Sequence, residues 1–147
     1  MRPFLLILTA TLMACTRNEV PDLNAPERIA AGQTIYAQHC ATCHGAQLEG
    51  QPDWTARRPD GRLPAPPHND EGHTWHHDSE LLFNLVKHGL VPPYAPAGYV
   101  SDMPAFGGRL SDEDIWAVLA FIRSRWSPEV RARHDALEAQ LRQQRGG

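Results

Sequence analysis

The sequence has few cysteines, no excess of basic charge and no long apolar run after its first residues. Its 147 residues include three cysteines, an odd number that is too small for a framework of disulfide bonds. The 14 basic and 17 acidic residues give a formal net charge of -3. Without a large basic surface to neutralise phosphates, no nucleic-acid partner is expected. The length suits a single domain, and no internal repeat is visible.

The first residues have the pattern of an export signal. A positive charge at Arg2 precedes an apolar run that continues to Cys15 but is too short to span a bilayer. We therefore expect residues 1–14 to be a signal peptide and residues 15–24 to be a polar tether. No second apolar stretch of ~18 residues follows, so any membrane association must rest on this end.

The end of this run resembles a bacterial lipoprotein signal, in which cleavage before a cysteine lets its thiol carry a lipid. The last residues are Leu12-Met13-Ala14-Cys15, and methionine is an unusual choice at its position. This resemblance predicts lipidation of Cys15, export to the periplasm and attachment to the membrane surface. Cleavage nearby by the ordinary signal peptidase would instead leave a soluble chain.

The spacing of apolar residues predicts a first helix over residues 24–39. Asn24 suits the capping position, and Glu27 three residues later fits a capping box. Gly32 lies among the apolar positions of one face. We expect another helix to approach closely at this glycine.

The spacing of apolar residues and the capping residues predict two further helices and a polar C-terminal extension. A short helix is expected from Asp78 or Ser79 to Gly89, and a longer one begins at Ser111 with apolar residues over more than one stripe. Residues 127–147 are mostly Glu, Arg, Gln and Ala. They predict a solvated helix, with a helix that docks onto a partner as the alternative.

The segment Cys40-Ala41-Thr42-Cys43-His44 has the spacing of an attachment site for c-type haem. Two intervening residues form a turn, so both thiols reach the vinyl groups on one porphyrin edge while His44 ligates the iron. If Cys15 carries lipid, this assignment uses all three cysteines. A thioredoxin-like pair would follow a strand in an alternating pattern, and a zinc site would need histidines, because no second cysteine pair exists.

A six-coordinate iron needs a second axial ligand, and methionine or histidine is suitable. Of the three methionines, Met1 and Met13 lie in the predicted signal. Met103 lies in a loop directly before Pro104, where its thioether can be presented to the iron. We expect Met103 to ligate the iron opposite His44; the alternative is a hydrophobic anchor for the loop.

These features resemble a bacterial class I cytochrome c, over residue 25 to about residue 125. The matching features are the glycine and aromatic residue of the leading helix, the attachment motif, the Met103-Pro104 loop and the segment from Leu110 to Trp116. The resemblance implies a cytochrome c domain over residues 25–126. Its fold would be all-α, with the first and last helices crossing near one haem c and a long loop inserted after the attachment motif.

The same resemblance implies a role as a single-electron carrier rather than an enzyme, as a subunit or partner of an oxidoreductase. Its partners would be a redox donor and an acceptor, whose identities the sequence does not reveal. In family members, the histidine that ligates the iron commonly donates a hydrogen bond from its other ring nitrogen to a proline carbonyl. Pro64, Pro66 and Pro67 are the candidates for His44.

The long loop departs from a minimal family member because it holds four histidines, at His68, His73, His76 and His77. One interpretation is a second site for copper or another transition metal. It would make the chain a haem-plus-metal oxidoreductase acting on a small molecule, or a metal-handling lipoprotein. The other interpretation is that these histidines cap turns, pack on the haem edge and bind propionates. Spacing alone leaves both open.

Overall fold

The computed structural model describes residues 20–146; the predicted signal peptide, Cys15 and most of the tether lie outside them. Within the described residues the chain is helical and has no strand, so the all-α prediction is confirmed. None of these helices is both long and apolar enough to cross a bilayer. The elements are α1 (Pro26–His39), α2 (Ala41–His44), the short 3₁₀ turn η1 (Thr74–His76), α3 (Ser79–His88), α4 (Asp112–Ser124) and α5 (Pro128–Gly146).

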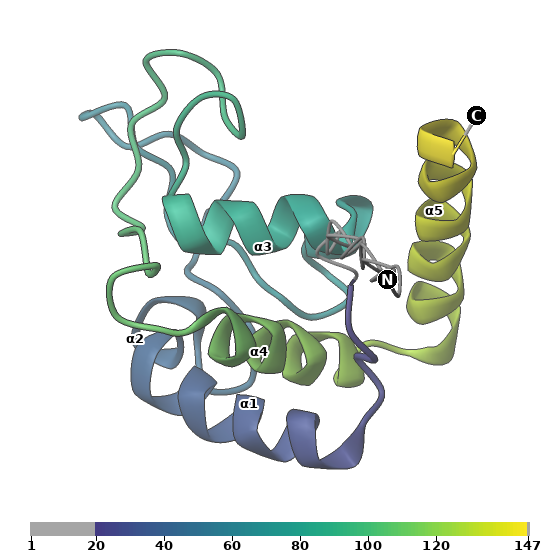
Figure 1. Cartoon of the computed structure of the whole chain (residues 1–147). Coiled ribbons are helices and arrows are strands. Elements are labelled where there is room, and N and C mark those ends of the chain that lie inside the picture. The colour runs from purple at the N-terminus through teal and green to yellow at the C-terminus, as the bar shows by residue number, and fades with distance from the viewer. Residues whose placement is uncertain (1–19, 147) are drawn as a thin grey trace, which may run out of the picture.

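Helices α1 and α4 pack directly against each other, as Figure 1 shows, and their backbones touch at Gly32. A Cβ added to Gly32 would lie 1.9 Å from the carbonyl oxygen of Ala117 and 3.0 Å from the Cβ of Phe121. Only glycine permits this approach. An ion pair between Arg28 and Glu113 joins the first turns of the two helices. The close contact predicted at Gly32 is confirmed.

Helices α3 and α4 begin at the capping residues that the sequence predicted. The carboxylate of Asp78 accepts a hydrogen bond from the N–H of Leu81 at 3.1 Å. At α4, the Ser111 hydroxyl accepts from the Asp114 N–H at 3.1 Å, and the Asp114 carboxylate accepts from the Ser111 N–H at 3.0 Å. This reciprocal pair is a capping box.

The cap predicted for α1 is wrong. Pro26 is the first helical residue, so Ala25 rather than Asn24 takes the capping position, and no side chain caps the helix. Glu27 therefore forms no capping box. The side-chain oxygen of Asn24 instead accepts a hydrogen bond from Arg123 at 2.7 Å, which ties the start of α1 to the end of α4.

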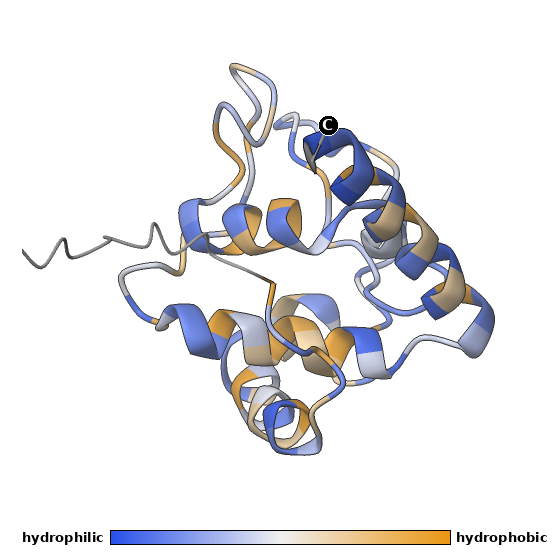
Figure 2. Cartoon of the chain, turned by 45° about the vertical axis from the view of Figure 1, so that its right-hand side comes forward, coloured by the Kyte–Doolittle hydropathy of each residue, from blue (hydrophilic) through white to orange (hydrophobic). Residues whose placement is uncertain are grey.

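Helix α4 contributes to both hydrophobic clusters of the core, and Figure 2 shows its concentration of hydrophobic residues. The buried members of the first cluster are Leu23, Phe83, Phe106, Leu110, Ile115, Trp116, Leu119 and Ala120. Those of the second are Tyr36, Leu48, Val118, Phe121, Ile122, Trp126 and Val130. One helix serves both clusters because its apolar residues cover more than one stripe.

Helix α5 packs on the segment that precedes α3, although its sequence is mostly polar. Val130 is buried in the second cluster, and the Glu138 carboxylate accepts a hydrogen bond from the Ser79 N–H at 2.6 Å. The Arg133 guanidinium lies over the Trp75 ring, 5.8 Å from its centroid. One face of α5 is thus buried against the histidine-rich loop.

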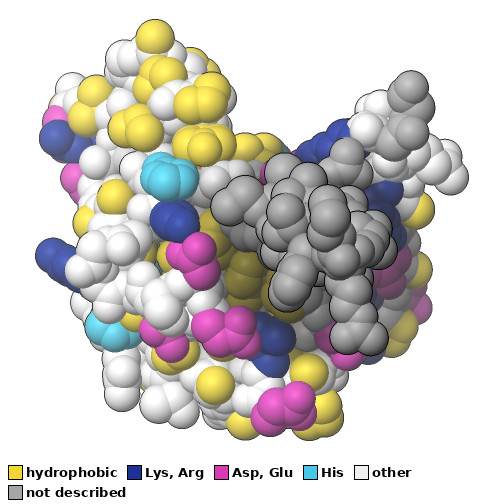
Figure 3. All heavy atoms as spheres, in the orientation of Figure 1, with side chains coloured by type: hydrophobic (Ala, Val, Ile, Leu, Met, Phe, Trp, Pro, Cys, Tyr) yellow, Lys and Arg dark blue, Asp and Glu magenta, His cyan; other side chains and the backbone are white. Residues whose placement is uncertain are grey.

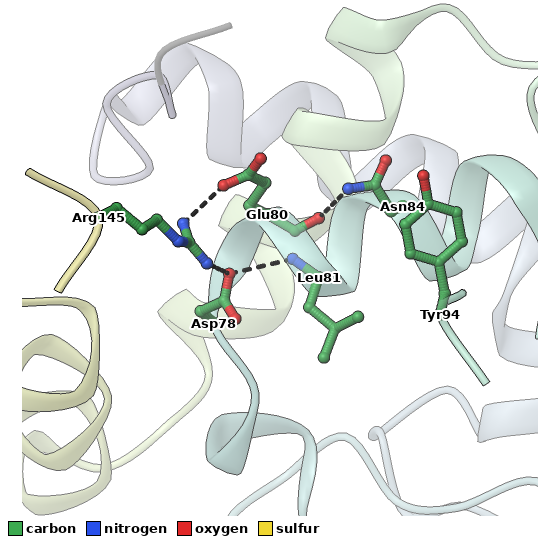
Figure 4. Close-up of a pocket in the computed structure, with 6 residues that line it drawn as sticks. All are labelled: Asp78, Glu80, Leu81, Asn84, Tyr94 and Arg145. Atoms are coloured by element: carbon green, nitrogen blue, oxygen red, sulfur yellow. Dashed lines mark hydrogen bonds and ion pairs between the residues drawn. The ribbon is translucent and has the colours of Figure 1, made fainter. Parts of the chain in front are cut away.

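The C-terminal end of α5 reaches the start of α3 (Figure 4). Arg145 pairs with Asp78 at 3.2 Å and with Glu80 at 2.6 Å. These three residues line a shallow pocket of about 340 Å³ together with Leu81, Asn84 and Tyr94. No residue of the predicted haem site lines this pocket.

Candidate functional site

The attachment motif forms one tight helical turn directly after α1. The N–H groups of Cys43 and His44 both donate to the Cys40 carbonyl, at 3.1 and 2.9 Å. The turn ends at Gly45, which has the left-handed φ of 80°. Cys43 is exposed, Cys40 is partly buried, and both thiols are free. Cys40, Cys43 and His44 therefore lie on one turn of helix.

Burial, followed by the neighbouring Cys43, raises the pKa of the Cys40 thiol to about 11. Cys40 is therefore a neutral thiol at pH 7. A covalent bond to a cofactor would form at this partly buried thiol and at the exposed thiol of Cys43.

His44 is oriented by Pro66. The Nδ1–H of His44 donates to the Pro66 carbonyl at 2.8 Å, and the residue is only 8% exposed. A carbonyl oxygen can only accept, so Nδ1 carries the proton and Nε2 keeps a lone pair for a metal. Burial lowers the pKa of His44, against the opposing effect of the Pro66 bond, and favours the neutral ring that a metal needs. Of the three candidate prolines, the structure selects Pro66.

Two glycines hold the chain next to Pro66. A Cβ on Gly50 would lie 2.4 Å from the backbone nitrogen of Pro67, and a Cβ on Gly72 would lie 2.0 Å from the Pro67 carbonyl oxygen. The Gly50 N–H also donates to the His44 carbonyl at 2.8 Å. The long loop is thus ordered by close backbone contacts, which keep the Pro66 carbonyl beside His44.

His68 stacks on His44. The two ring centroids are 4.0 Å apart and the ring planes differ by 21°. His68 Nδ1 is hydrogen-bonded to the Thr74 hydroxyl at 2.8 Å. Burial, and then the neighbouring His44, lower the pKa of His68 well below its ordinary value. His68, a predicted ligand of a second metal, is therefore a neutral ring packed on His44, the predicted ligand of the haem iron.

The other three histidines of the loop also pack on aromatic rings. His73 stacks on Trp54 with centroids 5.6 Å apart and meets His77 edge-on at 5.3 Å, while His76 stacks on its neighbour Trp75 at 3.7 Å. Across residues 20–146 no group of three or more His, Cys, Asp or Glu side chains is arranged to hold a metal ion. This arrangement gives no support to the second metal site predicted from His68, His73, His76 and His77, although His73 and His77 are in contact.

Met103 packs against the first hydrophobic cluster from the loop between α3 and α4. Its N–H donates to the Ser101 hydroxyl at 3.1 Å. The preceding residue, Asp102, forms ion pairs with Arg58 and with Arg62, the latter at 2.9 Å. The loop that carries Met103 is thus fixed to the first part of the long loop.

The apolar surface around this loop is only partly covered. Figure 3 shows the molecule hollowed between α3 and α4, with hydrophobic side chains in the hollow. Five side chains pack on the first cluster while remaining partly exposed: Ile29, Ile35, Leu82, Val86 and Met103. A flat apolar cofactor would complete their burial. Two thiols, an imidazole with a free Nε2 and a thioether are the donor set that haem c takes.

Trp126 supports this site without any signal in the sequence. Its indole N–H donates to the His68 carbonyl at 2.8 Å. The sequence shows only an aromatic residue after the last apolar helix, and its contact with a residue 58 positions earlier depends on the tertiary fold. Pattern analysis of either segment could not have found it.

Known proteins match the chain over this region. Residues 27–122 match the family model for cytochrome c oxidase, cbb3-type, subunit III. Thiosulfate dehydrogenase of Stutzerimonas stutzeri (strain A1501) is 34% identical over 113 residues, which are 76% of this chain and 32% of that protein. The gluconate 2-dehydrogenase cytochrome c subunit of Pantoea cypripedii is 29% identical over 104 residues, 69% of this chain and 21% of that subunit. The chain thus spans a third or less of these relatives. No solved structure matches it.

Proposed function

Because the chain belongs to the cytochrome c oxidase cbb3-type subunit III family of c-type cytochrome domains, we propose that Cys40 and Cys43 hold its haem and that His44 and Met103 ligate the iron. The family implies a covalently bound haem c and single-electron transfer in a redox chain. When bound, the haem supplies an iron that takes one electron from a donor as it becomes ferrous and returns it to an acceptor as it becomes ferric.

The observation that carries this assignment is the 2.8 Å hydrogen bond from His44 Nδ1 to the Pro66 carbonyl. It leaves Nε2 as the only ring nitrogen with a lone pair and fixes the position of Nδ1. Cys40 and Cys43 lie on the same turn as His44, so one turn of helix presents all three groups to one cofactor. The residues therefore bind and orient, and no residue has to move a proton.

Met103 is proposed as the second axial ligand on its chemistry and its place. A thioether is a soft, neutral ligand, and pairing it with histidine favours the ferrous state. Asp102, paired with Arg58 and Arg62, anchors the residue next to it. The side chain itself packs beside the partly covered apolar surface.

Replacement of Met103 by alanine tests both the ligand and the carrier role. The wild-type protein is expected to give the alkaline pyridine spectrum of covalent haem c, a thioether-to-iron charge-transfer band when ferric, and no binding of carbon monoxide when ferrous. Met103→Ala is expected to lose the band and bind carbon monoxide, because the iron gains an open position. The control is Val100→Ala in the same loop, where the side chain is 46% exposed; it should behave as wild type.

A band that persists in Met103→Ala would remove Met103 from the assignment. A pyridine spectrum without covalent haem would instead overturn the assignment of Cys40 and Cys43. Rapid carbon monoxide binding by the wild-type protein would favour the alternative function, a haem oxidoreductase that acts on a small molecule at an open iron position.

We further propose that the chain is the electron carrier of an oxidoreductase, as a subunit or partner, and not the catalyst. The two relatives are named as a dehydrogenase and as the cytochrome c subunit of a dehydrogenase, and this chain spans only 32% and 21% of them. Reduction of the chain by a purified dehydrogenase, with no substrate turnover by the chain alone, is the expected result. Turnover by the isolated chain would contradict it.

The proposed location is the periplasmic side of a membrane. It rests on the signal pattern of residues 1–14 and on Cys15 as the lipid-bearing residue, all outside the described residues. Cys15→Ser is expected to move the protein from the membrane fraction to the soluble periplasmic fraction. An unchanged distribution would show that no lipid on Cys15 anchors the chain.

A further inference from the structure

We infer that His68 is a positioning residue for His44, whose imidazole plane it fixes by stacking. The inference rests on the proposed function, in which His44 ligates the haem iron. His68 was expected to bind a metal itself or to contact the haem edge, and neither role accounts for its contact with the His44 ring. The 4.0 Å distance between the ring centroids and the 21° angle between the planes describe nearly parallel rings in contact.

The hydrogen bond to Pro66 fixes one atom of the His44 ring but holds its plane only loosely. A bond to a carbonyl oxygen tolerates a broad range of directions, so the ring can rock while Nδ1 stays within reach of Pro66. A flat side chain packed on one face removes this freedom, because rocking would drive the two rings into each other. Pro66 and His68 therefore constrain different degrees of freedom of His44.

His68 is itself held at three points, which makes it a rigid support. Its backbone N–H donates to the Leu48 carbonyl at 2.8 Å, and its carbonyl accepts from the Trp126 indole at 2.8 Å. Its Nδ1 is hydrogen-bonded to the Thr74 hydroxyl at 2.8 Å, and Thr74 is buried. The bond to Thr74 sets the rotation of the ring, so the plane of His68 is fixed independently of its contact with His44.

The Leu48 backbone shows that the loop is shaped for this support. Leu48 has a φ of 64°, in the left-handed region that non-glycine residues rarely adopt, and is 1% exposed. In this conformation its carbonyl accepts from the N–H groups of both His68 and Asn69, at 2.8 and 3.3 Å. The strained residue thus aims its carbonyl at the start of the histidine-rich loop.

The orientation of an axial imidazole decides how its π electrons meet the iron orbitals, and groups around a ligand tune the metal in this way. A fixed plane gives one ferric low-spin species with one set of g values. A rocking plane gives a distribution of g values and broadened lines. The electron paramagnetic resonance spectrum therefore reports the orientation of the ring apart from the protein's activity.

Three variants of the holoprotein separate the contributions. His68→Phe keeps a flat ring on His44, His68→Leu removes it, and Thr74→Val keeps the histidine but removes the hydroxyl that sets its rotation. We expect His68→Leu to broaden the lowest-field ferric line about two-fold and to shift the hyperfine-shifted proton resonances of the axial ligand. His68→Phe should restore the wild-type linewidth, and Thr74→Val should give an intermediate one.

Equal linewidths in wild type, His68→Leu and His68→Phe would overturn the inference. Equal broadening in His68→Leu and His68→Phe would also overturn it, because the hydrogen bond and not the stacked ring would then be responsible. If His68→Leu does not mature, an unbroadened spectrum of Thr74→Val overturns it. The pyridine spectrum and the charge-transfer band of the wild type test the proposed function separately, so a failure there is distinct from a failure here.

Discussion

At the scale of single residues, the site depends on Gly50, where the absence of a side chain lets the chain at Pro66 come close. Gly50 has a φ of 70°, and a Cβ there would lie 2.4 Å from the Pro67 nitrogen and 2.7 Å from the Pro66 carbonyl carbon. Both the backbone conformation and the space require glycine. The proton on His44 Nδ1 depends on this contact, because Pro66 is its acceptor.

Gly50→Ala is expected to lower the free energy of unfolding by about 3 kcal/mol, of which about 1 kcal/mol is the left-handed conformation and the rest the overlap with Pro66 and Pro67. Urea unfolding of the holoprotein measures it. Gly61→Ala is the matched control, because Gly61 also has a left-handed φ, of 82°, but no atom lies within 4 Å of its Cβ position. It should lose only about 1 kcal/mol. Equal losses in the two variants would contradict the close contact.

The residues of the site differ in how far they could be predicted. Cys40, Cys43 and His44 follow from a local motif, because covalent attachment demands a fixed spacing along the chain. Pro66 could only be narrowed to three prolines, since its choice depends on how the loop returns to His44. His68 was predicted as a metal ligand because of its side-chain type. Its contact with the His44 ring depends on the tertiary fold, so the spacing of residues along the sequence could not reveal it.

At the scale of elements, the crossing of α1 and α4 is the contact on which the fold depends. Helix propensity alone predicts that Gly32→Ala stabilises α1 by about 1 kcal/mol. The Cβ would, however, lie 1.9 Å from the Ala117 carbonyl oxygen, which is backbone and cannot turn aside. The two effects have opposite signs, and the overlap is the larger.

Gly32→Ala is therefore expected to lower the free energy of unfolding by at least about 3 kcal/mol, as measured by urea unfolding of the holoprotein. Ala31→Gly at the exposed neighbouring position measures propensity alone and should cost about 1 kcal/mol. A Gly32→Ala protein more stable than wild type would show that the helices do not touch at this point.

The elements themselves were predictable where periodicity and capping chemistry agree. Asp78 and Ser111 begin α3 and α4 as predicted, because a side chain that accepts from the first turn stabilises a helix start wherever it occurs. The start of α1 was misassigned by one residue, since Asn24 bonds to Arg123 of α4 instead of to its own helix. A competing tertiary partner is invisible in a local pattern.

At the scale of the whole molecule, α5 braces the histidine-rich loop through a buried histidine. His134 is 1% exposed, its Nε2–H donates to the His77 carbonyl at 3.1 Å, and its ring meets Trp126 edge-on. Its Nδ1 is buried with no hydrogen-bond partner. Burial has the largest effect on the pKa of His134 and lowers it. The Glu138 carboxylate raises this pKa by less, and Arg123 makes a smaller contribution that lowers it.

Acid is therefore expected to weaken the docking of α5. The folded protein binds the His134 proton less readily than the unfolded chain, whose histidine has a pKa of 6.5. Stability from this residue is complete above pH 6.5 and falls as the pH drops below it, by at most about 1.4 kcal/mol per pH unit. Urea unfolding at a series of pH values from about 7.5 to about 5 measures this loss.

His134→Phe is the comparison that isolates this group, because His44, His68, His73 and His77 also have lowered pKa values. Phenylalanine fills the same buried position and has no proton to bind. The variant should lose stability less steeply than wild type as the pH falls below 6.5. Parallel curves for the two proteins would show that His134 does not titrate on unfolding.

The crossing of α1 and α4 also sets an order in time. The ion pair of Arg28 with Glu113 joins residues 85 positions apart, and closing a loop of this length costs chain entropy. In a chain made from its N-terminus, the residues of α1 and the cysteines beside it are made before those of α4. Cys43 nevertheless stays exposed in the folded chain, so its thiol remains open to attachment even after α4 has packed on α1.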